Sequence, residues 1–255
     1  MFSVAGKVIV ITGTARGLGA ALARHFAREG AQIALLDVDD QTEVADATGG
    51  LAITCDIRET EHVMAALDEV EDKLGPIAGL VNNAGVYSAD NSRADFVRIF
   101  ETNVWGAAQC ATAVAERMAP GGSIVSIGSH ICEHQASTED LMMYVASKAA
   151  LLNVNRCLTI ALGPKGIRCN IVAPSVISLP GGYYGPELLK AFDYIAPLGI
   201  APDATEVCAA VQYYLSDASR HVSGVHHIMD GGFVQGYSLN AFDALMGPGG
   251  RLSTL

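Results

Sequence analysis

Charge is scarce in this 255-residue sequence: charged residues make up 17% of it, and lysine and arginine form no cluster. The formal net charge at pH 7 is -11. A protein that neutralises nucleic-acid phosphates needs a basic face, so this balance argues against a nucleic-acid partner. It disfavours acidic carrier proteins for the same reason.

Long apolar runs are also missing. No stretch reaches the roughly eighteen uncharged apolar residues that a membrane-spanning helix requires. Residues 1–13 lack the charged region, apolar run and cleavage site of a secretory signal. We therefore expect a cytoplasmic protein without a membrane partner.

Cysteine motifs are absent as well. The six cysteines stand singly, without a CxxC pair, and we expect buried apolar side chains instead of bridges. His130, Cys132 and His134 alternate in a way that suggests zinc, but no fourth ligand lies near them in the sequence. We therefore predict no metal site.

The sequence does contain a regular order of strand and helix patterns. Half of the residues are hydrophobic, which is enough for a large core. Short apolar runs with β-branched residues predict strands at 7–12, 31–37, 51–56, 77–83, 122–128, 167–173 and 225–230. Helical patterns follow the first strand through residue 29 and occupy 59–74, 95–118, 143–162 and 203–216. Because apolar strands alternate with helices, we predict one doubly wound α/β domain over 1–255, with a parallel sheet.

Ligands bind such folds beyond the carboxyl ends of the strands. The first predicted strand runs into TGTARGLG, which places Gly13, Gly17 and Gly19 before a helix. Glycines allow a tight turn, and the unpaired N–H groups of a helix N-terminus attract a pyrophosphate. Asp37 closes the second strand, where a carboxylate accepts hydrogen bonds from both ribose hydroxyls and repels a 2′-phosphate. The pattern predicts NAD, although Arg16 in the same turn is a residue that could reach a 2′-phosphate.

Tyr144 and Lys148 lie four residues apart at the start of a predicted helix, so their side chains share one face. An ammonium roughly 4 Å from a phenol lowers the phenol's pKa from about 10 toward the range that a general acid or base needs. This pair therefore predicts acid/base chemistry. A chance YxxxK on a solvated helix face is the alternative interpretation.

Four motifs together resemble the short-chain dehydrogenase/reductase family. They occur in the family's order and spacing between residue 6 and about residue 232, and they read TGTARGLG (12–19), NNAG (82–85), YVASK (144–148) and MDGG (229–232). The resemblance implies a Rossmann-type domain with a seven-stranded parallel sheet. It also implies an NAD-dependent alcohol dehydrogenase or ketone reductase that transfers a hydride between nicotinamide and a secondary alcohol or ketone.

The resemblance further implies a place for individual residues. Arg16 and Leu18 join the three glycines at the cofactor, and Tyr144 and Lys148 contact it as well as the substrate. The remaining cofactor contacts would be Asp56 and Ile57 along the adenine, Asn83 near the adenosine ribose and Ile177 beside the nicotinamide carboxamide.

Ser129 follows the fifth predicted strand, where its hydroxyl can hold the substrate oxygen beside Tyr144. The family's serine lies thirteen residues before the tyrosine, but Ser129 lies fifteen before it and position 131 is Ile, so we infer a longer loop. Ser126 is a weaker alternative. Asn103 matches the family asparagine that binds a water beside the lysine in a proton relay. The alternative for Asn103 is an asparagine that caps or kinks its own helical turn.

The other polar residues of this stretch are expected to have no catalytic role. We expect Glu139 and Asp140 in solvent, and we expect His130 to touch the substrate from the pocket rim. After the sixth predicted strand the family reads PGxxxT. Here Ser175 replaces the Gly and Leu179 the Thr, with Ser178 one position away as a substitute.

Residues 179–199 occupy the place of the family's substrate lid. Gly181, Gly182 and Gly185 predict a mobile segment. Its apolar side chains predict a neutral hydrophobic alicyclic or aromatic substrate; they are Tyr183, Tyr184, Leu188, Leu189, Phe192 and Tyr194. The tail 233–255 runs beyond the family pattern, and its apolar residues indicate that it docks on a surface the sequence does not identify.

Apolar residues surround more than one face of the helices at 95–118 and 146–162, which predicts a homo-oligomer. The resemblance implies a tetramer. Related activities on the same fold remain open, namely a 3-oxoacyl reductase, a dehydratase or an epimerase. A non-catalytic dinucleotide-binding sensor is the third class, and the matched set of Ser129, Tyr144, Lys148 and Asn103 counts against it.

Overall fold

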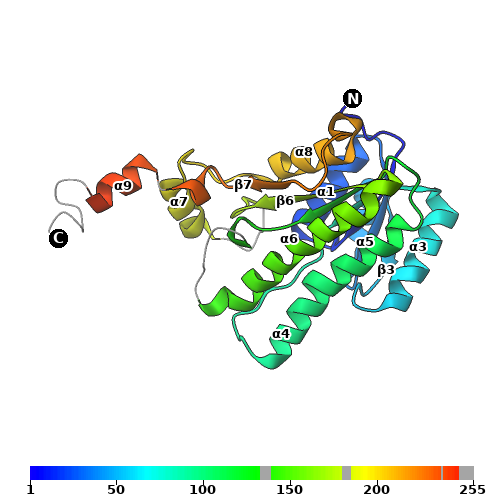
Figure 1. The fold of residues 1–255 in the computed structure, drawn as a ribbon, viewed down its shortest axis with the longest axis horizontal. Coiled ribbons are helices and arrows are strands. Elements are labelled where there is room, and N and C mark those ends of the chain that lie inside the picture. The colour runs from blue at the N-terminus through cyan, green and yellow to red at the C-terminus, as the bar shows by residue number, and fades with distance from the viewer. Residues whose placement is uncertain (133–138, 180–184, 237, 247–255) are drawn as a thin grey trace.

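The computed structural model describes residues 1–132, 139–179, 185–236 and 238–246. In these residues the predicted strands form one seven-stranded sheet of β1 (Val8–Thr12), β2 (Gln32–Asp37), β3 (Leu51–Thr54), β4 (Ile77–Asn82), β5 (Ser123–Ile127), β6 (Arg168–Pro174) and β7 (His226–Met229). All neighbours are parallel, in the order β3-β2-β1-β4-β5-β6-β7 (Figure 1). Strands β1 to β3 are added toward one edge of the sheet and strands β4 to β7 toward the other, so the strand order reverses between β1 and β4. This arrangement confirms a single doubly wound, Rossmann-type α/β domain.

Strand β1 shows why the sheet is buried on both faces. Its side chains alternate between the two sides, with Val8 and Val10 in one apolar cluster and Ile9 and Ile11 in the other. The first cluster packs under α3 (Thr60–Leu74), α5 (Ala107–Ala115) and α6 (Met142–Leu162). The second packs under α1 (Gly17–Arg28) and α8 (Ala204–Leu215). Two apolar faces of this kind require helices on both sides of the sheet.

Several elements differ from the sequence-based expectation. The single helix predicted at 95–118 is divided into α4 (Arg93–Phe100), a π-helical turn (Glu101–Gly106) and α5. Three short helices had no prediction: α2 (Thr42–Thr48), α7 (Pro186–Ile195) and α9 (Leu239–Met246). Helix α7 lies within the segment predicted as a mobile lid, where Pro186 at the first helical position starts a regular helix. Residues 180–184 of that segment lie outside the described residues.

The C-terminal tail docks on α7. Ser238 donates a hydrogen bond to the Tyr194 carbonyl (2.6 Å), and its backbone N–H donates to the Ile195 carbonyl (2.9 Å). Phe233 packs on Phe192 with the ring centroids 5.5 Å apart. Figure 1 shows α7 and α9 side by side in an arm that extends from the end of the sheet. The surface that the tail contacts is therefore the lid segment of the same chain.

Five of the six cysteines are buried free thiols, and Cys157 is exposed, which corrects the expectation of burial at that position. No helix within the described residues is long and apolar enough to cross a membrane.

Ser238→Ala is expected to loosen α7, because it removes the hydroxyl that bonds the Tyr194 carbonyl and accepts from the Ala241 N–H (3.1 Å). If the free energy of local unfolding falls by about 1 kcal/mol, the amides of residues 186–195 should exchange about fivefold faster. Hydrogen–deuterium exchange would measure this, with the amides of β1 as the internal control. Unchanged exchange in α7 would contradict the docking described above.

Candidate active site

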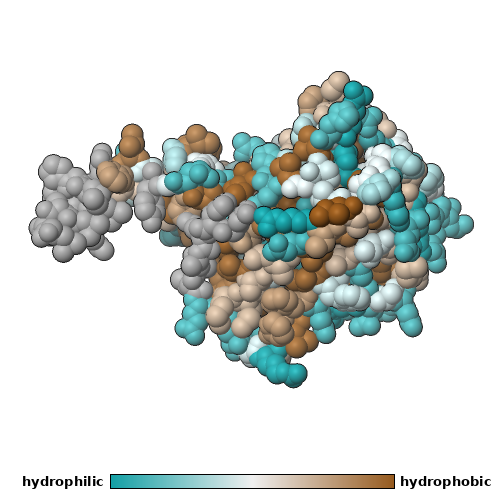
Figure 2. Space-filling view, viewed as in Figure 1, coloured by the Kyte–Doolittle hydropathy of each residue, from teal (hydrophilic) through white to brown (hydrophobic). Residues whose placement is uncertain are grey.

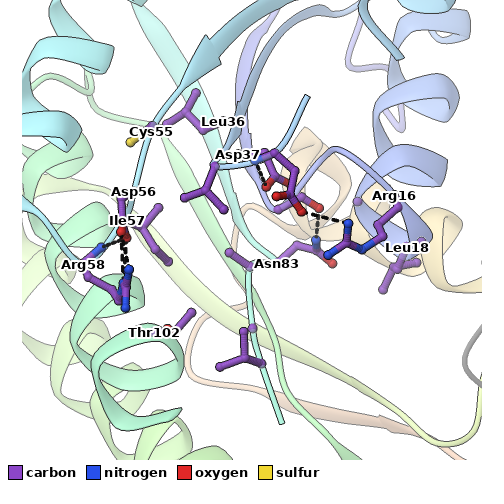
Figure 3. Close-up of a pocket in the computed structure, with 18 of the residues that line it drawn as sticks. Arg16, Leu18, Leu36, Asp37, Cys55, Asp56, Ile57, Arg58, Asn83 and Thr102 are labelled. Atoms are coloured by element: carbon purple, nitrogen blue, oxygen red, sulfur yellow. Dashed lines mark hydrogen bonds and ion pairs between the residues drawn. The ribbon is translucent and has the colours of Figure 1, made fainter. Parts of the chain in front are cut away.

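A pocket of about 390 Å³ opens at the carboxyl ends of β1, β2, β3 and β4 (Figure 3). This volume lies in the range of roughly 300–1,000 Å³ that is typical of ligand sites. The pocket gathers nine residues predicted to bind cofactor: Gly13, Arg16, Gly17, Leu18, Gly19, Asp37, Asp56, Ile57 and Asn83. Sequence analysis assigned no role to the other lining residues, which are Leu36, Val38, Asp39, Cys55, Arg58, Ala84, Gly85, Val86, Arg98 and Thr102.

In the turn after β1, Gly19 and Gly17 are glycines for different physical reasons. A Cβ on Gly19 would lie 1.9 Å from the Gly13 carbonyl oxygen, so this position must pack closely. Gly17 adopts a φ of +61° and a Cβ there would meet no atom within 4 Å, so the space above it is open. Helix α1 begins at Gly17 without a side-chain cap. The first N–H groups of α1 are thus available to an anion such as a pyrophosphate.

Asp37 stands at the end of β2 beside this turn. Its Oδ2 accepts a hydrogen bond from the Ala15 N–H (2.8 Å), and its Oδ1 accepts from the Asp39 N–H (3.1 Å). Arg16, the residue that could have favoured a 2′-phosphate, forms an ion pair with Asp39 (2.8 Å). Figure 3 shows Arg16 and Asp37 on the same side of the pocket. The carboxylates therefore dominate this end of the pocket.

Asp56 and Ile57 line the pocket from the loop after β3. Arg58 donates from Nε to both oxygens of Asp56 (2.9 and 3.1 Å), and this hydrogen bonding holds the pKa of the carboxyl below its usual range. Ile57 is buried in the core, and its carbonyl accepts a hydrogen bond from Gln109. Arg58 also lines the pocket, which neither its residue type nor its position in the sequence predicted.

Asn83 joins the two halves of the sheet at the switch point. Its amide donates to the carbonyls of Thr12 (3.0 Å) and Gly13 (2.9 Å), while its backbone N–H bonds the Thr12 hydroxyl (3.1 Å). The Thr12 hydroxyl also accepts from the Ala84 N–H (3.0 Å). Asn83 therefore fixes the glycine turn in addition to lining the pocket.

Lys148 and Tyr144 lie on the same face of α6, as their spacing predicts. The Lys148 ammonium donates to the Ile127 carbonyl at the end of β5 (2.8 Å) and lies 5.8 Å from the centroid of the Tyr144 ring. Lys148 is only 4% exposed, and this burial lowers its pKa to about 8. Tyr144 is half-buried and packs edge-on against Tyr87. The structure therefore places the ammonium of Lys148 beside the ring of Tyr144.

Asn103 connects the loop after β4 to α6. From the π-helical turn, its Oδ1 accepts from the Val86 N–H (2.8 Å), and its amide donates to the Val86 carbonyl (2.9 Å) and the Ser147 hydroxyl (2.9 Å). Ser147 in turn donates to the Tyr144 carbonyl (2.7 Å). The side chain bonds neighbouring segments, so it does not cap its own turn. The turn that contains it is irregular, because it is π-helical. π-Helical turns of this kind are frequent at functional sites.

Ser129 lies beyond the end of β5, two residues after the carbonyl that holds Lys148, and is buried. Ser126, the weaker alternative, lies within β5 itself. His130 is more buried than a position at the pocket rim would be: it is 8% exposed and packs near Phe233 and Phe192. Glu139 and Asp140 are exposed, as expected. His134 lies outside the described residues.

The segment after β6 differs from the pocket residues. Ile177 has its side chain in the core, so any ligand contact there falls to its backbone. Ser178 is exposed, and its N–H bonds the Pro202 carbonyl (2.9 Å), so it is held toward α8. Leu179 packs against the core. Neither Ile177 nor the catalytic candidates Ser129, Tyr144, Lys148 and Asn103 line the pocket itself.

Lys148→Met is expected to raise the stability of the ligand-free protein at pH 7, by up to about 3 kcal/mol, because it removes a buried charge. The folded pKa of about 8 lies below the value of 10.5 for an exposed lysine. The unfolded state therefore binds more protons between these values, and wild-type stability should rise with pH across that window. The difference in stability between Lys148→Met and the wild type should therefore become smaller as the pH rises through that window.

Urea unfolding at pH 7, 8, 9 and 10 would measure this difference. The matched control is Lys165→Met, at an exposed lysine, which should leave the pH dependence unaltered. A Lys148→Met protein that is less stable than wild type at every pH would contradict the description of Lys148 as a penalised buried charge.

Known proteins match this chain over most of its length. The family model described as enoyl-(acyl carrier protein) reductase matches residues 13–234. The 3-alpha-(or 20-beta)-hydroxysteroid dehydrogenase of Mycobacterium tuberculosis (strain ATCC 25618 / H37Rv) is 32% identical over 252 residues, covering 94% of each chain. The D-threitol dehydrogenase of Mycolicibacterium smegmatis is 33% identical over 251 residues, covering 91% of this chain and 94% of the relative.

A solved structure gives the same picture. The short-chain dehydrogenase/reductase from Serratia marcescens BCRC 10948 superposes with a TM-score of 0.84 at 28% identity, covering 90% of this chain and 98% of that one.

Proposed function

This chain belongs to the short-chain dehydrogenase/reductase family, and on that premise we propose that it is an NAD-dependent oxidoreductase for a neutral hydrophobic secondary alcohol and its ketone. Membership makes the protein an oxidoreductase that uses a nicotinamide dinucleotide. The choice of NAD, the residue roles and the substrate class are our proposals.

The contact between the pocket wall and Lys148 carries this proposal. Gly85 lines the pocket, and a Cβ placed on it would lie 3.3 Å from the Asn103 Oδ1 and 3.6 Å from the Lys148 ammonium. A ligand in the pocket that extends past Gly85 therefore reaches the lysine and Tyr144. This adjacency of dinucleotide pocket and acid/base pair is what an alcohol dehydrogenase requires.

We assign the proton chemistry to residues of this chain. When bound, the nicotinamide supplies the acceptor or donor of the hydride. Tyr144 takes the hydroxyl proton during alcohol oxidation and returns it during ketone reduction, while the buried Lys148 charge stabilises its phenolate. Ser129 holds the substrate oxygen. Asn103 positions α6 through Ser147, and the second lone pair of its Oδ1 remains for the relay water.

The carboxylates of the pocket support NAD over NADP. A 2′-phosphate would meet Asp37, and the nearest arginine of the turn, Arg16, is engaged by Asp39. Asp37 repels a 2′-phosphate, and Asp39 competes with it for Arg16. Both effects weaken the binding of NADP relative to NAD.

The lid segment supports an apolar, uncharged substrate. Phe192 and Leu189 seat α7 on the core, whereas Leu188 and Tyr194 remain exposed by 48% and 49%. Lys190 is the only base in α7, so an anionic substrate would find little to pair with there. Two of the predicted aromatic contacts, Tyr183 and Tyr184, lie outside the described residues.

An acyl-chain reductase is the second candidate, because the matching family model is described as an enoyl-(acyl carrier protein) reductase. An acidic carrier would need free cations around the site. The arginines at the described pocket are instead paired: Arg58 with Asp56, Arg98 with Asp95, and Arg16 with Asp39. This pairing favours the free alcohol over the carrier-bound chain.

We also propose a homo-oligomer, and a tetramer by family membership. Large apolar side chains are exposed on the π-helical turn and on α6, with Trp105 at 53% and Ile160 at 80%. Figure 2 shows apolar side chains gathered on the face that α5 and α6 present. A second copy would remove this surface from water.

The proposed activity predicts that the purified protein reduces NAD with cyclohexanol or 1-phenylethanol at a higher kcat/KM than with threitol. Tyr144→Phe should lower kcat by about a thousandfold or more while NAD binding persists, because it removes the proton-transferring hydroxyl. An NADH absorbance assay and NAD titration would measure both. Near-normal turnover of Tyr144→Phe would contradict the mechanism, and a clear preference for threitol would contradict the substrate class.

Cofactor choice should follow Asp37. Asp37→Ser combined with Val38→Arg replaces a repulsive carboxylate and adds a phosphate partner, so the NADP/NAD preference should shift toward NADP by about a hundredfold. Steady-state kinetics with both cofactors would measure it. Asp46→Ser, at a carboxylate outside the pocket, is the control. A wild-type preference for NADP at equal concentration would show that the role given to Asp37 is wrong.

Oligomer formation predicts that the wild type sediments as a species larger than a monomer at micromolar concentration. Ile160→Asp combined with Trp105→Glu should shift it toward the monomer, because charge is costly in an apolar interface. Analytical ultracentrifugation would measure both. A stable wild-type monomer would refute the proposed assembly.

A further inference from the structure

Two buried polar atoms at neighbouring strand ends have no hydrogen-bond partner among the residues that the structure describes. They are the Nδ1 of His130, which follows β5, and the hydroxyl of Ser175, which follows β6. Their side chains are 8% and 6% exposed. A buried polar atom without a partner is destabilising, so its presence in a folded protein requires a reason.

Ser175 differs from the other side chains that bury an unpartnered atom. Asn82, Asn91, Asp95 and Asn155 each form a hydrogen bond through their second polar atom. The hydroxyl is the only polar atom of the Ser175 side chain, and it has no partner within the described residues. The whole hydrogen-bonding capacity of this side chain is therefore left for a ligand.

Both residues lie on the sheet edge of the proposed site. Strands β5 and β6 pair in parallel, with the Gly128 N–H bonded to the Val172 carbonyl (2.8 Å) just before Ser129 and His130. The dinucleotide pocket covers the ends of β1 to β4. Because ligands of doubly wound folds extend across the switch point, the ends of β5 and β6 receive the other half of the bound molecules.

The surroundings of His130 favour an uncharged ligand group. Its ring lies 5.9 Å from the Phe233 ring and 6.3 Å from the Phe192 ring. Burial lowers the pKa of His130, so the imidazole is neutral, and a neutral ring has one donor and one acceptor. The ring bonds the Pro174 carbonyl, which leaves the Nδ1 as the atom without a partner among the described residues. The Asp230 carboxylate, which acts against this shift, already accepts from the N–H groups of Gly232 (2.9 Å) and Val234 (2.8 Å). Neither ring partner of His130 carries a charge, and the charged group that acts on it is a carboxylate, which would repel an anionic ligand.

We propose that His130 and Ser175 form a polar subsite that binds an uncharged carbonyl, hydroxyl or carboxamide group of the bound ligand. The subsite rests on the proposed function and deepens it. Its ligand group comes from one of two sources, the carboxamide of the nicotinamide or a second oxygen on the substrate, away from the reacting carbon. Both sources offer the same uncharged donors and acceptors.

The first test separates a ligand-binding role from a structural one. Ser175→Ala should not lower the melting temperature of the ligand-free protein, since its hydroxyl has no hydrogen-bond partner among the described residues. His130→Phe, with its similar ring, also removes the bond to the Pro174 carbonyl, so the comparison of melting temperatures is confined to Ser175→Ala. Ser219→Ala is the matched control, because that buried hydroxyl accepts from Arg168 (2.6 Å) and donates to the Tyr214 carbonyl (3.0 Å), and it should lower the melting temperature. A loss in Ser175→Ala equal to that in Ser219→Ala would overturn the proposal.

The second test identifies the source of the group by calorimetric titration and kinetics. If the carboxamide binds here, both variants should weaken NAD about threefold to tenfold and leave ADP-ribose, which lacks nicotinamide, unchanged. If a substrate oxygen binds here, NAD affinity should persist, and the kcat/KM preference for cyclohexane-1,4-diol over cyclohexanol should fall by a similar factor. The subsite would be overturned if the variants changed neither the ratio of NAD to ADP-ribose affinity nor the ratio of kcat/KM for the diol to that for cyclohexanol.

Failure of the proposed function has a different signature. A wild-type protein that does not bind NAD would contradict the oxidoreductase, and the subsite with it, before any variant is compared. A wild type that binds NAD but oxidises neither alcohol would contradict the substrate class, and the NAD and ADP-ribose affinities would then decide on the subsite alone.

Discussion

A buried ammonium at the carboxyl edge of the sheet is the constraint around which the site is arranged. Lys148 gives up most of its hydration for one hydrogen bond to the Ile127 carbonyl, and among the described residues it forms no ion pair. Such a charge is costly to keep. The end of β5 fixes its position, α6 places Tyr144 on the same face, and Gly85 leaves the space between it and the pocket.

The same edge of the sheet contains further polar groups without partners among the described residues, which a ligand could bind. Helix α1 begins without a cap, Gly17 is held at a positive φ below open space, and Ser175 buries a hydroxyl without a partner in the described chain. The buried hydroxyl and the uncapped helix end leave polar groups without partners in the described chain, and the open glycine turn leaves room for a ligand to reach them. Their common location, and not any single residue, indicates that this edge was shaped by a ligand.

Local patterns predicted what local chemistry controls. The strands, the glycine turn and Asp37 follow from apolar runs, backbone freedom and charge at a strand end, and the structure brings the turn and Asp37 into one pocket. Long-range contacts decided the rest. Arg16 is taken up by Asp39, His130 is buried by Phe192 and Phe233 from distant segments, and the π-helical turn interrupts a continuous helical pattern. No periodicity in the sequence contains that information.

In the function that we propose, an alcohol carbon and a nicotinamide exchange a hydride directly at the site beside Lys148. Incubation of the wild-type protein with NAD and cyclohexanol deuterated at the carbinol carbon, followed by NMR of the dinucleotide, tests this claim most directly. We predict one deuterium at C4 of the nicotinamide, on a single face of the ring. Cyclohexanone formed without deuterium in the dinucleotide, or no transfer from any deuterated secondary alcohol, would contradict it.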